Sequence, residues 1–227
     1  LTMEELEALT AKVKDAIALL SIPKYEEASD DAPVDMTTVI VNNGFEAGNI
    51  SGWTNSGTID AQSQNNASFD NKQGTYYGEK WHVNGTVDIN QTLAHLPAGT
   101  YELTAYAYST ATDCILYANG ISVPVTETSG LYTVVVKLAA DGDPLKIGVS
   151  WSDTGDKWTC MDEFTLTYYG AASAKEETSS TDIEGVDSSA AVTPVAIYTI
   201  SGVKVDAMQK GLNIVKFSDG STKKILK

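Results

Sequence analysis

The stretch GTVDINQTLAHLPAGTYELTAYAYS, residues 85–109, decides the fold class of this chain. Its first part places apolar Val87 and Ile89 at every second position, and its second part does the same with Leu103 and Ala105. A period of two is typical of β-strands that bury one face. The segment LPAGT between the two runs contains Pro and Gly, which favour a turn. The stretch therefore predicts two antiparallel strands joined by a turn.

The same pattern extends over residues 34–170. The runs ILYANGISVPV, LYTVVVKL, PLKIGVSW and TCMDEFTLTYY are separated by turn signals, and Asn119-Gly120 is a strong hairpin signal. About nine short strands with no helical period between them indicate two packed antiparallel sheets. We therefore expect a mostly β protein built on a jelly-roll β-sandwich.

Three further segments flank this domain. Residues 1–30 predict a helix, because apolar residues recur there at helical spacing until Ser21-Ile22-Pro23 stops the pattern. These apolar residues are Leu6, Leu9, Val13, Ile17 and Leu20. Residues 171–190 have the small, polar and acidic composition of a linker, and residues 191–227 predict three short strands in a small C-terminal β unit.

Composition excludes several classes of partner. The 227 residues carry a net charge of −15 and include no arginine, which disfavours nucleic acid and anionic membrane surfaces. No apolar run approaches the ~18 residues of a membrane-spanning helix, so we expect no membrane insertion. The two cysteines, Cys114 and Cys160, fit no zinc or CxxC spacing. They form either a disulfide or two buried free thiols.

One predicted strand face combines aromatic and polar side chains. Glu102, Tyr106 and Tyr108 alternate away from the expected core, and the neighbouring run offers Asp88 and Asn90, which we expect on the same side. Sugar rings stack on aromatic faces, while carboxylates and amides bond their hydroxyls. These residues are candidates for a glycan cleft. Outer-face tyrosines are also common simply because of their β-propensity.

The tryptophans offer a second candidate site. Trp53, Trp81, Trp151 and Trp158 lie at or near predicted strand ends. Tryptophan is mostly a core residue, so we expect at least two of the four to be buried. Trp151 and Trp158 flank the loop SDTGDK and are the pair most expected to be exposed for sugar binding.

No catalytic site is predicted. The two histidines lie in no nucleophile motif of the G-x-S-x-G type. Glycoside hydrolysis needs two acids across a cleft, whereas Asp162 and Glu163 are adjacent and are expected on opposite faces of a strand. The sequence therefore predicts a protein that is not an enzyme.

Two resemblances extend these inferences. The pieces VNNGFEAGNISGW, INQTLAHLPAGTYELTAYAYS and CMDEFTLTYY make residues 39–169 resemble the galactose-binding-like jelly-roll of carbohydrate-binding modules. This resemblance implies a structural calcium ion held by Glu46 and Asp162 together with backbone carbonyls, and Asn42 or Asn43 is a candidate for a further oxygen donor. The alternative is that Glu46 is a surface carboxylate and Asp162 caps a turn. It also implies a ligand site in loops at one edge of the sandwich rather than on a sheet face.

The second resemblance concerns residues 195–227 and is carried by the pieces IYTISGVKV and QKGLNIVKFSDGSTKKILK within them. They resemble the C-terminal β segment of secreted Bacteroidetes-type proteins, which acts as a sorting signal or remains as a small β module. This resemblance implies a secreted or cell-surface location.

Together these observations predict a non-catalytic, extracellular carbohydrate-binding module within a larger glycan-processing or surface protein. The alternative is a structural or adhesive surface protein that binds a protein partner and has no sugar site. The N-terminal helix is a candidate contact for a protein partner in either case.

Overall fold

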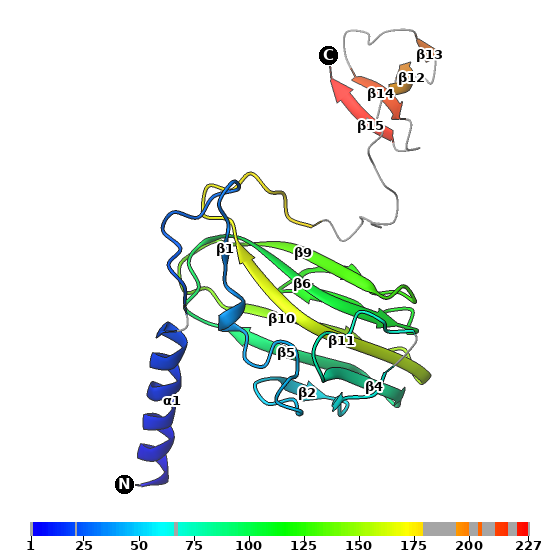
Figure 1. Ribbon diagram of the computed structural model, residues 1–227. Helices are drawn as coiled ribbons and strands as arrows, with labels where there is room; N and C mark the ends of the chain where they lie inside the picture. Colours follow the sequence, from blue (N-terminus) through cyan, green and yellow to red (C-terminus); the bar gives the residue numbers. More distant parts are fainter. Residues whose placement is uncertain are drawn as a thin grey trace. The chain divides into compact units, whose positions relative to one another are not determined.

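The structure is a computed structural model that describes residues 2–20, 22–65, 68–178, 194–199, 204–205, 212–217 and 222–226. The chain divides into two compact units, Leu1–Ile183 and Glu184–Lys227. The first unit contains helix α1 and a β-sandwich, and the second is a small β-sheet (Figure 1). The predicted fold class, mostly β with antiparallel sheets, an N-terminal helix and a small C-terminal sheet, is confirmed.

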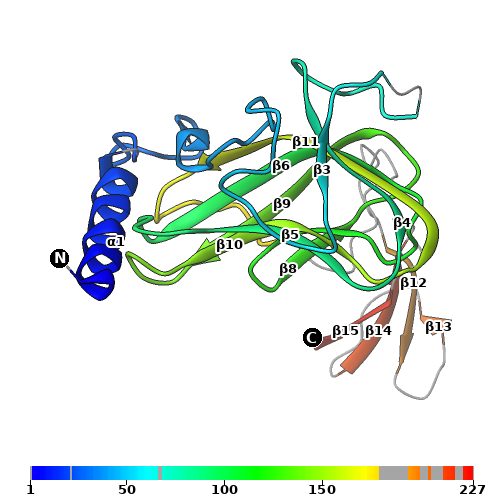
Figure 2. The same ribbon diagram turned by 90° about the horizontal axis from the view of Figure 1, so that it is seen from below.

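The first sheet of the sandwich, sheet A, is antiparallel and follows the order β3-β4-β11-β6-β9, with β1 also paired to β11. Its strands are β1 (Val34–Asp35), β3 (Asp60–Gln62), β4 (Tyr77–Val83), β6 (Gly99–Ser109), β9 (Gly130–Leu138) and β11 (Gly155–Tyr168). Strand β11 is the longest of these and lies between β4 and β6 (Figures 1 and 2). It therefore joins the two halves of the sheet.

The second sheet, sheet B, follows the order β2-β5-β10-β7-β8. Its strands are β2 (Thr54–Ser56), β5 (Val87–Leu93), β7 (Ile115–Ala118), β8 (Ile121–Pro124) and β10 (Leu145–Trp151). The predicted hairpin at Asn119-Gly120 joins β7 to β8, and Asn119 has a φ of 52°. Asparagine tolerates this left-handed conformation better than most residues do, which explains the turn.

One hydrophobic core fills the space between the sheets. The inward positions of β6, such as Leu103 and Ala105, pack in the same cluster as Ile89 from β5 and Ile147 from β10. The alternation of residues 85–109 thus assigns the buried faces correctly. The expectation that β5 and β6 lie side by side is wrong, because each strand pairs within a different sheet.

The segment between β1 and β2 turns in order to bury two aromatic side chains. Residues 37–39 form a 3-10 helix, η1 (Thr37–Val39), and the chain then turns twice before β2. Phe45 and Trp53 from this segment are buried and pack 5.7 Å apart, between ring centroids, and the Trp53 Nε1–H donates to the carbonyl of Asn42 at 3.1 Å. Phe164 of β11 completes the aromatic cluster.

Helix α1 (Met3–Leu20) ends just before the predicted stop at Ser21-Ile22-Pro23. Every described side chain along it is exposed, and its Asp15 carboxylate contacts His95 Nε2 of the β5–β6 turn at 2.5 Å. No helix in the described part of the chain is long and apolar enough to span a membrane. Cys114 and Cys160 are buried free thiols, so of the two alternatives for the cysteines the disulfide is wrong.

Part of the predicted linker is described. Residues 171–178 run beside β9, where Thr178 Oγ1 accepts from the Val135 N–H at 2.7 Å and Glu177 Oε1 accepts from the Lys137 N–H at 2.8 Å. The remainder of the predicted linker, residues 179–190, lies outside the described residues.

The second unit is an antiparallel sheet of order β13-β12-β14-β15. Its strands are β12 (Pro194–Thr199), β13 (Lys204–Val205), β14 (Leu212–Phe217) and β15 (Thr222–Leu226). Where three strands were predicted, four are present among the described residues. The turns expected at Ser201-Gly202 and Asp219-Gly220 lie outside those residues.

Candidate functional site

The predicted aromatic-polar face does not form as one surface. Glu102, Tyr106 and Tyr108 belong to β6 of sheet A, whereas Asp88 and Asn90 belong to β5 of sheet B. Since both sets point away from the shared core, they lie on the two opposite outer faces of the sandwich. A single cleft containing all five side chains is therefore excluded.

On sheet A, the side chains predicted to bind glycan already bond or pack against other parts of the chain. Glu102 Oε2 pairs with Lys175 Nζ at 2.6 Å, and Glu102 Oε1 accepts from the Tyr169 hydroxyl at 3.1 Å. Tyr108 is only 8% exposed, and Tyr106 packs against the same buried cluster. These side chains support the outer face of the sheet more than they offer a binding surface.

On sheet B, Asp88 is the centre of a polar network. Its carboxylate accepts from the Tyr117 hydroxyl at 2.6 Å and the Asn90 side-chain amide at 2.9 Å, and it pairs with Lys146 Nζ at 3.0 Å. Tyr117 crosses Gly148 to reach Asp88, since a Cβ at Gly148 would lie 3.0 Å from the Tyr117 hydroxyl. Burial and the Asp88 carboxylate raise the pKa of Tyr117. The network satisfies its own members and stabilises this face of the sheet.

The tryptophans divide into a buried and an accessible pair. Trp53 and Trp151 are buried, at 7% and 2% exposed, so the prediction that Trp151 is exposed is wrong. Trp151 continues the inward phase of β10 after Val149, which places its ring in the core. Trp158 is half-buried, and Trp81 is 56% exposed.

Trp81 and Trp158 form one site, which we call the aromatic shelf together with Glu79 and Gln64. Trp81 of β4 and Trp158 of β11 are direct cross-strand partners. The four residues line an open hollow of about 270 Å³ on the outer face of sheet A. The ring of Tyr108 meets Trp158 edge-on, with centroids 5.2 Å apart, and fixes the inner indole in place.

Glu79 forms the polar part of the aromatic shelf. It is 8% exposed, and its Oε2 accepts from the Tyr77 hydroxyl at 2.8 Å. Gln64 Nε2 lies 3.4 Å from its Oε1, and the Cys160 thiol lies 3.9 Å from its Oε2. Burial, followed by the nearby Glu79 carboxylate, raises the pKa values of Tyr77 and Cys160, so both remain protonated donors at neutral pH. Their hydrogen bonds to Oε2 hold the carboxylate in one orientation.

Of the predicted metal ligands, Glu46 lies near the Asp162 carboxylate at the β11 bulge, and both Glu46 and Asn42 accept hydrogen bonds from the backbone. Glu46 Oε1 accepts from the backbone N–H groups of Thr75 and Tyr76, both at 2.8 Å. The Asn42 side chain is also engaged within the 41–54 segment. Its Nδ2 donates to the Asn49 carbonyl at 2.8 Å, and its Oδ1 accepts from the Ala47 N–H at 3.1 Å. The described residues contain no group of three or more His, Cys, Asp or Glu side chains placed to hold a metal ion. Calcium also uses backbone carbonyls, so the calcium ion stays a prediction.

Asp162 is the unusual member of this group. It is fully buried, and its two oxygens accept from the N–H groups of Gln73 at 2.8 Å and Glu163 at 2.9 Å. Burial raises its pKa to about 7, and the Glu163 and Glu46 carboxylates contribute in the same direction. Glu163 has a φ of 47° in the bulge. A Cβ at Gly44 would lie 2.7 Å from Glu163 Oε1 and 3.5 Å from Asp162 Oδ1. The expectation that the two carboxylates face opposite sides is therefore wrong.

Comparisons with known proteins give similarity only at the level of structure. No family model and no curated protein matches the chain. Among solved structures, the chain is similar to TmCBM61 in complex with β-1,4-galactotriose, with a TM-score of 0.46 and 23% identity over 56% of this chain and 96% of that one. It is also similar to the CBM22-1 xylan-binding domain from Paenibacillus barcinonensis Xyn10C, with a TM-score of 0.39 and 18% identity over 57% of this chain and 94% of that one.

A third similar structure is the enzymatically active domain of tailspike protein 4 from bacteriophage CBA120. The TM-score is 0.44 and the identity 14%, over 56% of this chain and 21% of that one. The structural neighbours thus include carbohydrate-binding modules with β-sandwich folds.

Proposed function

We propose that this chain is a non-catalytic carbohydrate-binding module that holds a glycan on the aromatic shelf. The observation that carries this proposal is the exposed indole of Trp81 beside the buried, oriented carboxylate of Glu79. An aromatic face covers the C–H side of a sugar ring, and a fixed carboxylate accepts hydrogen bonds from its hydroxyls. Trp158 extends the apolar surface, and Gln64 supplies an amide at the rim.

The charge of the aromatic shelf favours neutral glycans. Among the described residues, Glu79 is the one charged side chain that lines the hollow, so an anionic sugar would meet repulsion there. The hollow is shallow and open, and a single shallow site of this kind gives a Kd in the range of about micromolar to millimolar.

A glycan array tests the proposal. The chain is screened in calcium and in EDTA against neutral oligosaccharides, including β-1,4-galactotriose and xylan fragments. Saturable binding to at least one neutral glycan supports the proposal. No binding in either condition, by a chain whose melting temperature shows it to be folded, contradicts it.

A calcium ion near Glu46 and Asp162 remains part of the proposal. Its support is the fully buried Asp162 carboxylate, whose hydrogen-bond donors within the described residues are backbone N–H groups and which has two further carboxylates close by. A cation bound there would stabilise the ionised form of Asp162 and hold the 41–54 segment to β11. The residues present fit this role through Asp162 and Glu46, whereas Asn42 fits it poorly.

The secreted or cell-surface location also remains a proposal, together with the sorting role of residues 195–227 and the larger parent protein. They are supported by the sequence resemblances. A fusion of residues 195–227 to a reporter protein, expressed in a Bacteroidetes host, would test the sorting role through the amount of reporter outside the cells.

A second candidate function, adhesion through a protein partner, is favoured by helix α1. Its apolar stripe is exposed, with Leu9 at 50%, Val13 at 51% and Ile17 at 58%. A second copy of the chain is the simplest partner for such a stripe. Sedimentation equilibrium tests this candidate: it predicts a dimer that Val13→Glu converts to a monomer, and a monomeric starting protein would exclude that partner.

A further inference from the structure

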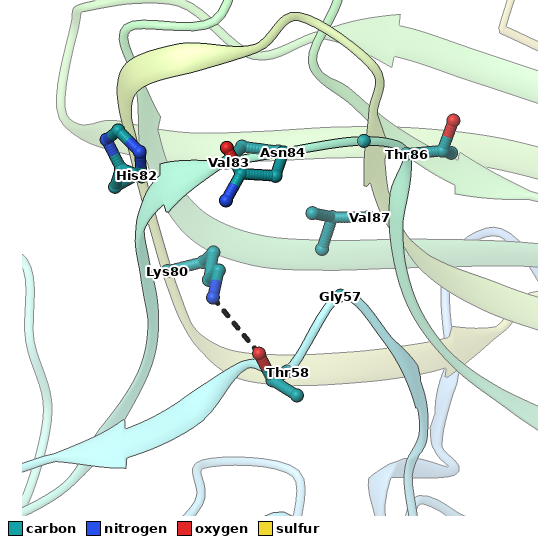
Figure 3. Close-up of a pocket in the computed structure, with 9 residues that line it drawn as sticks. Gly57, Thr58, Lys80, His82, Val83, Asn84, Thr86 and Val87 are labelled. Carbon is teal, nitrogen blue, oxygen red and sulfur yellow. Dashed lines mark hydrogen bonds between the residues drawn. The ribbon is translucent and has the colours of Figure 1, made fainter.

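A second hollow lies at the loop end of the sandwich, beside strand β4 (Figure 3). It has a volume of about 320 Å³ and is formed by the β2–β3 loop and the β4–β5 turn. We call it the lysine hollow. Its polar lining residues are Thr58, Lys80, His82, Asn84 and Thr86. Because side chains alternate along a strand, Lys80 and Trp81 point to opposite faces of β4. The lysine hollow and the aromatic shelf are therefore separate sites.

Lys80 determines the chemistry of the lysine hollow. It is half-buried, and its Nζ donates to Thr58 Oγ1 at 3.1 Å. Within the described part of the chain, no carboxylate lies within ion-pair distance of Lys80, whereas Lys146, Lys157 and Lys175 each pair with one. The chain has a net charge of −15, yet the half-buried ammonium group of Lys80 has no carboxylate partner among the described residues. It can therefore bind an anion from solution.

The backbone around Lys80 is held in a costly conformation. Thr58 has a φ of 53° and His82 a φ of 56°, in the left-handed region that a β-branched residue such as Thr rarely adopts. Such residues persist where the surrounding packing fixes them, and they cluster at binding sites. At Gly57, a Cβ would lie 2.7 Å from Val87 Cγ2, so this loop is closely packed. The loop conformation directs the Thr58 hydroxyl at Lys80.

An acidic residue at the rim is engaged by another side chain. Asp156, which is exposed, shares a hydrogen bond with His82 through its Oδ1, at 2.8 Å from His82 Nδ1. Lys80 therefore stays without a carboxylate partner even though an acidic residue lies close to the hollow.

We propose that the lysine hollow binds the carboxylate of an acidic sugar, a uronate residue of a glycan. One unpaired lysine matches one negative charge, and an ammonium–carboxylate hydrogen bond is among the stronger polar contacts in proteins. The hydroxyls of Thr58 and Thr86 and the amide of Asn84 are suitable partners for the sugar hydroxyls. The volume lies at the lower end of the range for small-ligand sites, which fits one or two sugar residues. No residue of the aromatic shelf lines this hollow, so the two sites are separate, while the choice of a sugar as the ligand rests on the proposed function.

The test compares two ligands that differ in charge, a carboxylate and its uncharged methyl ester. The full chain, labelled with ¹⁵N, is titrated with digalacturonate and with its methyl ester, and backbone amide shifts report the position and Kd of binding. The same titrations are repeated with Lys80→Met and with the matched control Lys137→Met, which removes an exposed lysine of β9.

We expect digalacturonate to shift the amides of residues 57–58 and 82–86. Its Kd is expected to rise at least tenfold in Lys80→Met, and to change less than twofold in Lys137→Met. The methyl ester is expected to bind the wild-type chain at least tenfold more weakly than the acid. Equal binding of acid and ester, or shifts confined to Trp81 and Trp158, would overturn the inference. The ester comparison uses the wild-type chain, so it decides the question even if Lys80→Met does not fold.

Discussion

Replacing Trp81 with alanine is expected to weaken glycan binding about twentyfold and to leave the fold intact. Trp81 is 56% exposed, and an indole side chain of about 250 Å² therefore leaves about 140 Å² open to solvent. A sugar ring on one face covers about half of this, about 70 Å². At about 25 cal/mol/Å² this area contributes about 1.8 kcal/mol, which corresponds to about twentyfold in Kd.

The assay is affinity electrophoresis or calorimetry with a neutral glycan that binds the wild-type chain. Leu131→Ala is the matched control, because Leu131 is also a large apolar residue of sheet A and is 54% exposed. Both variants are expected to unfold within about 0.5 kcal/mol of the wild type, since each replaces an exposed side chain. Equal loss of binding in both variants, or no loss in Trp81→Ala, would refute the reasoning.

Three further predictions concern other groups. Glu79→Gln is expected to weaken binding of a neutral glycan at least tenfold, because a hydrogen bond to a charged group contributes about 1.5–3 kcal/mol; unchanged binding by calorimetry would remove Glu79 from the site. Asp162 has a pKa raised from 3.8 to about 7 in the folded chain, so between these values the folded state holds more protons and stability falls as pH rises. In EDTA, thermal melts should therefore show a higher melting temperature at pH 5 than at pH 7.5. Calcium should reduce this difference, and Asp162→Asn should remove it. A melting temperature that rises with pH in EDTA would contradict the prediction. Burial raises the pKa of Cys114 to about 12 and also raises that of Cys160. Neither thiol should therefore react with a thiol reagent at pH 8 until the chain is denatured. Rapid reaction of the native chain would contradict this prediction.

The sequence predicts the faces of the strands better than it predicts their neighbours. The period of two in residues 85–109 correctly separates buried Leu103 from outward Glu102. It carries no information about pairing, because β6 pairs with β9 and β11, which lie far along the chain. The turn between β5 and β6 resembles a hairpin locally, yet here it carries the chain from one sheet to the other. Long-range packing decides this choice.

Strand alternation also predicts part of the candidate site. Trp151 continues the phase of Ile147 and Val149, so strand alternation alone could have placed it in the core. Trp81 follows Glu79 in the outward phase of β4, so the same alternation indicates its exposure. Gln64, by contrast, reaches the aromatic shelf from the β3–β4 loop, and irregular loops have no period from which such a position follows.

The most direct test of sugar binding at the aromatic shelf is a titration followed through the indole N–H signals of the four tryptophans. Single replacements of each tryptophan by phenylalanine assign the signals in a ¹⁵N-labelled chain. A neutral glycan is expected to shift the signals of Trp81 and Trp158 with one common Kd, and to leave those of buried Trp53 and Trp151 in place. Saturable binding without a shift of the Trp81 signal would contradict the central claim.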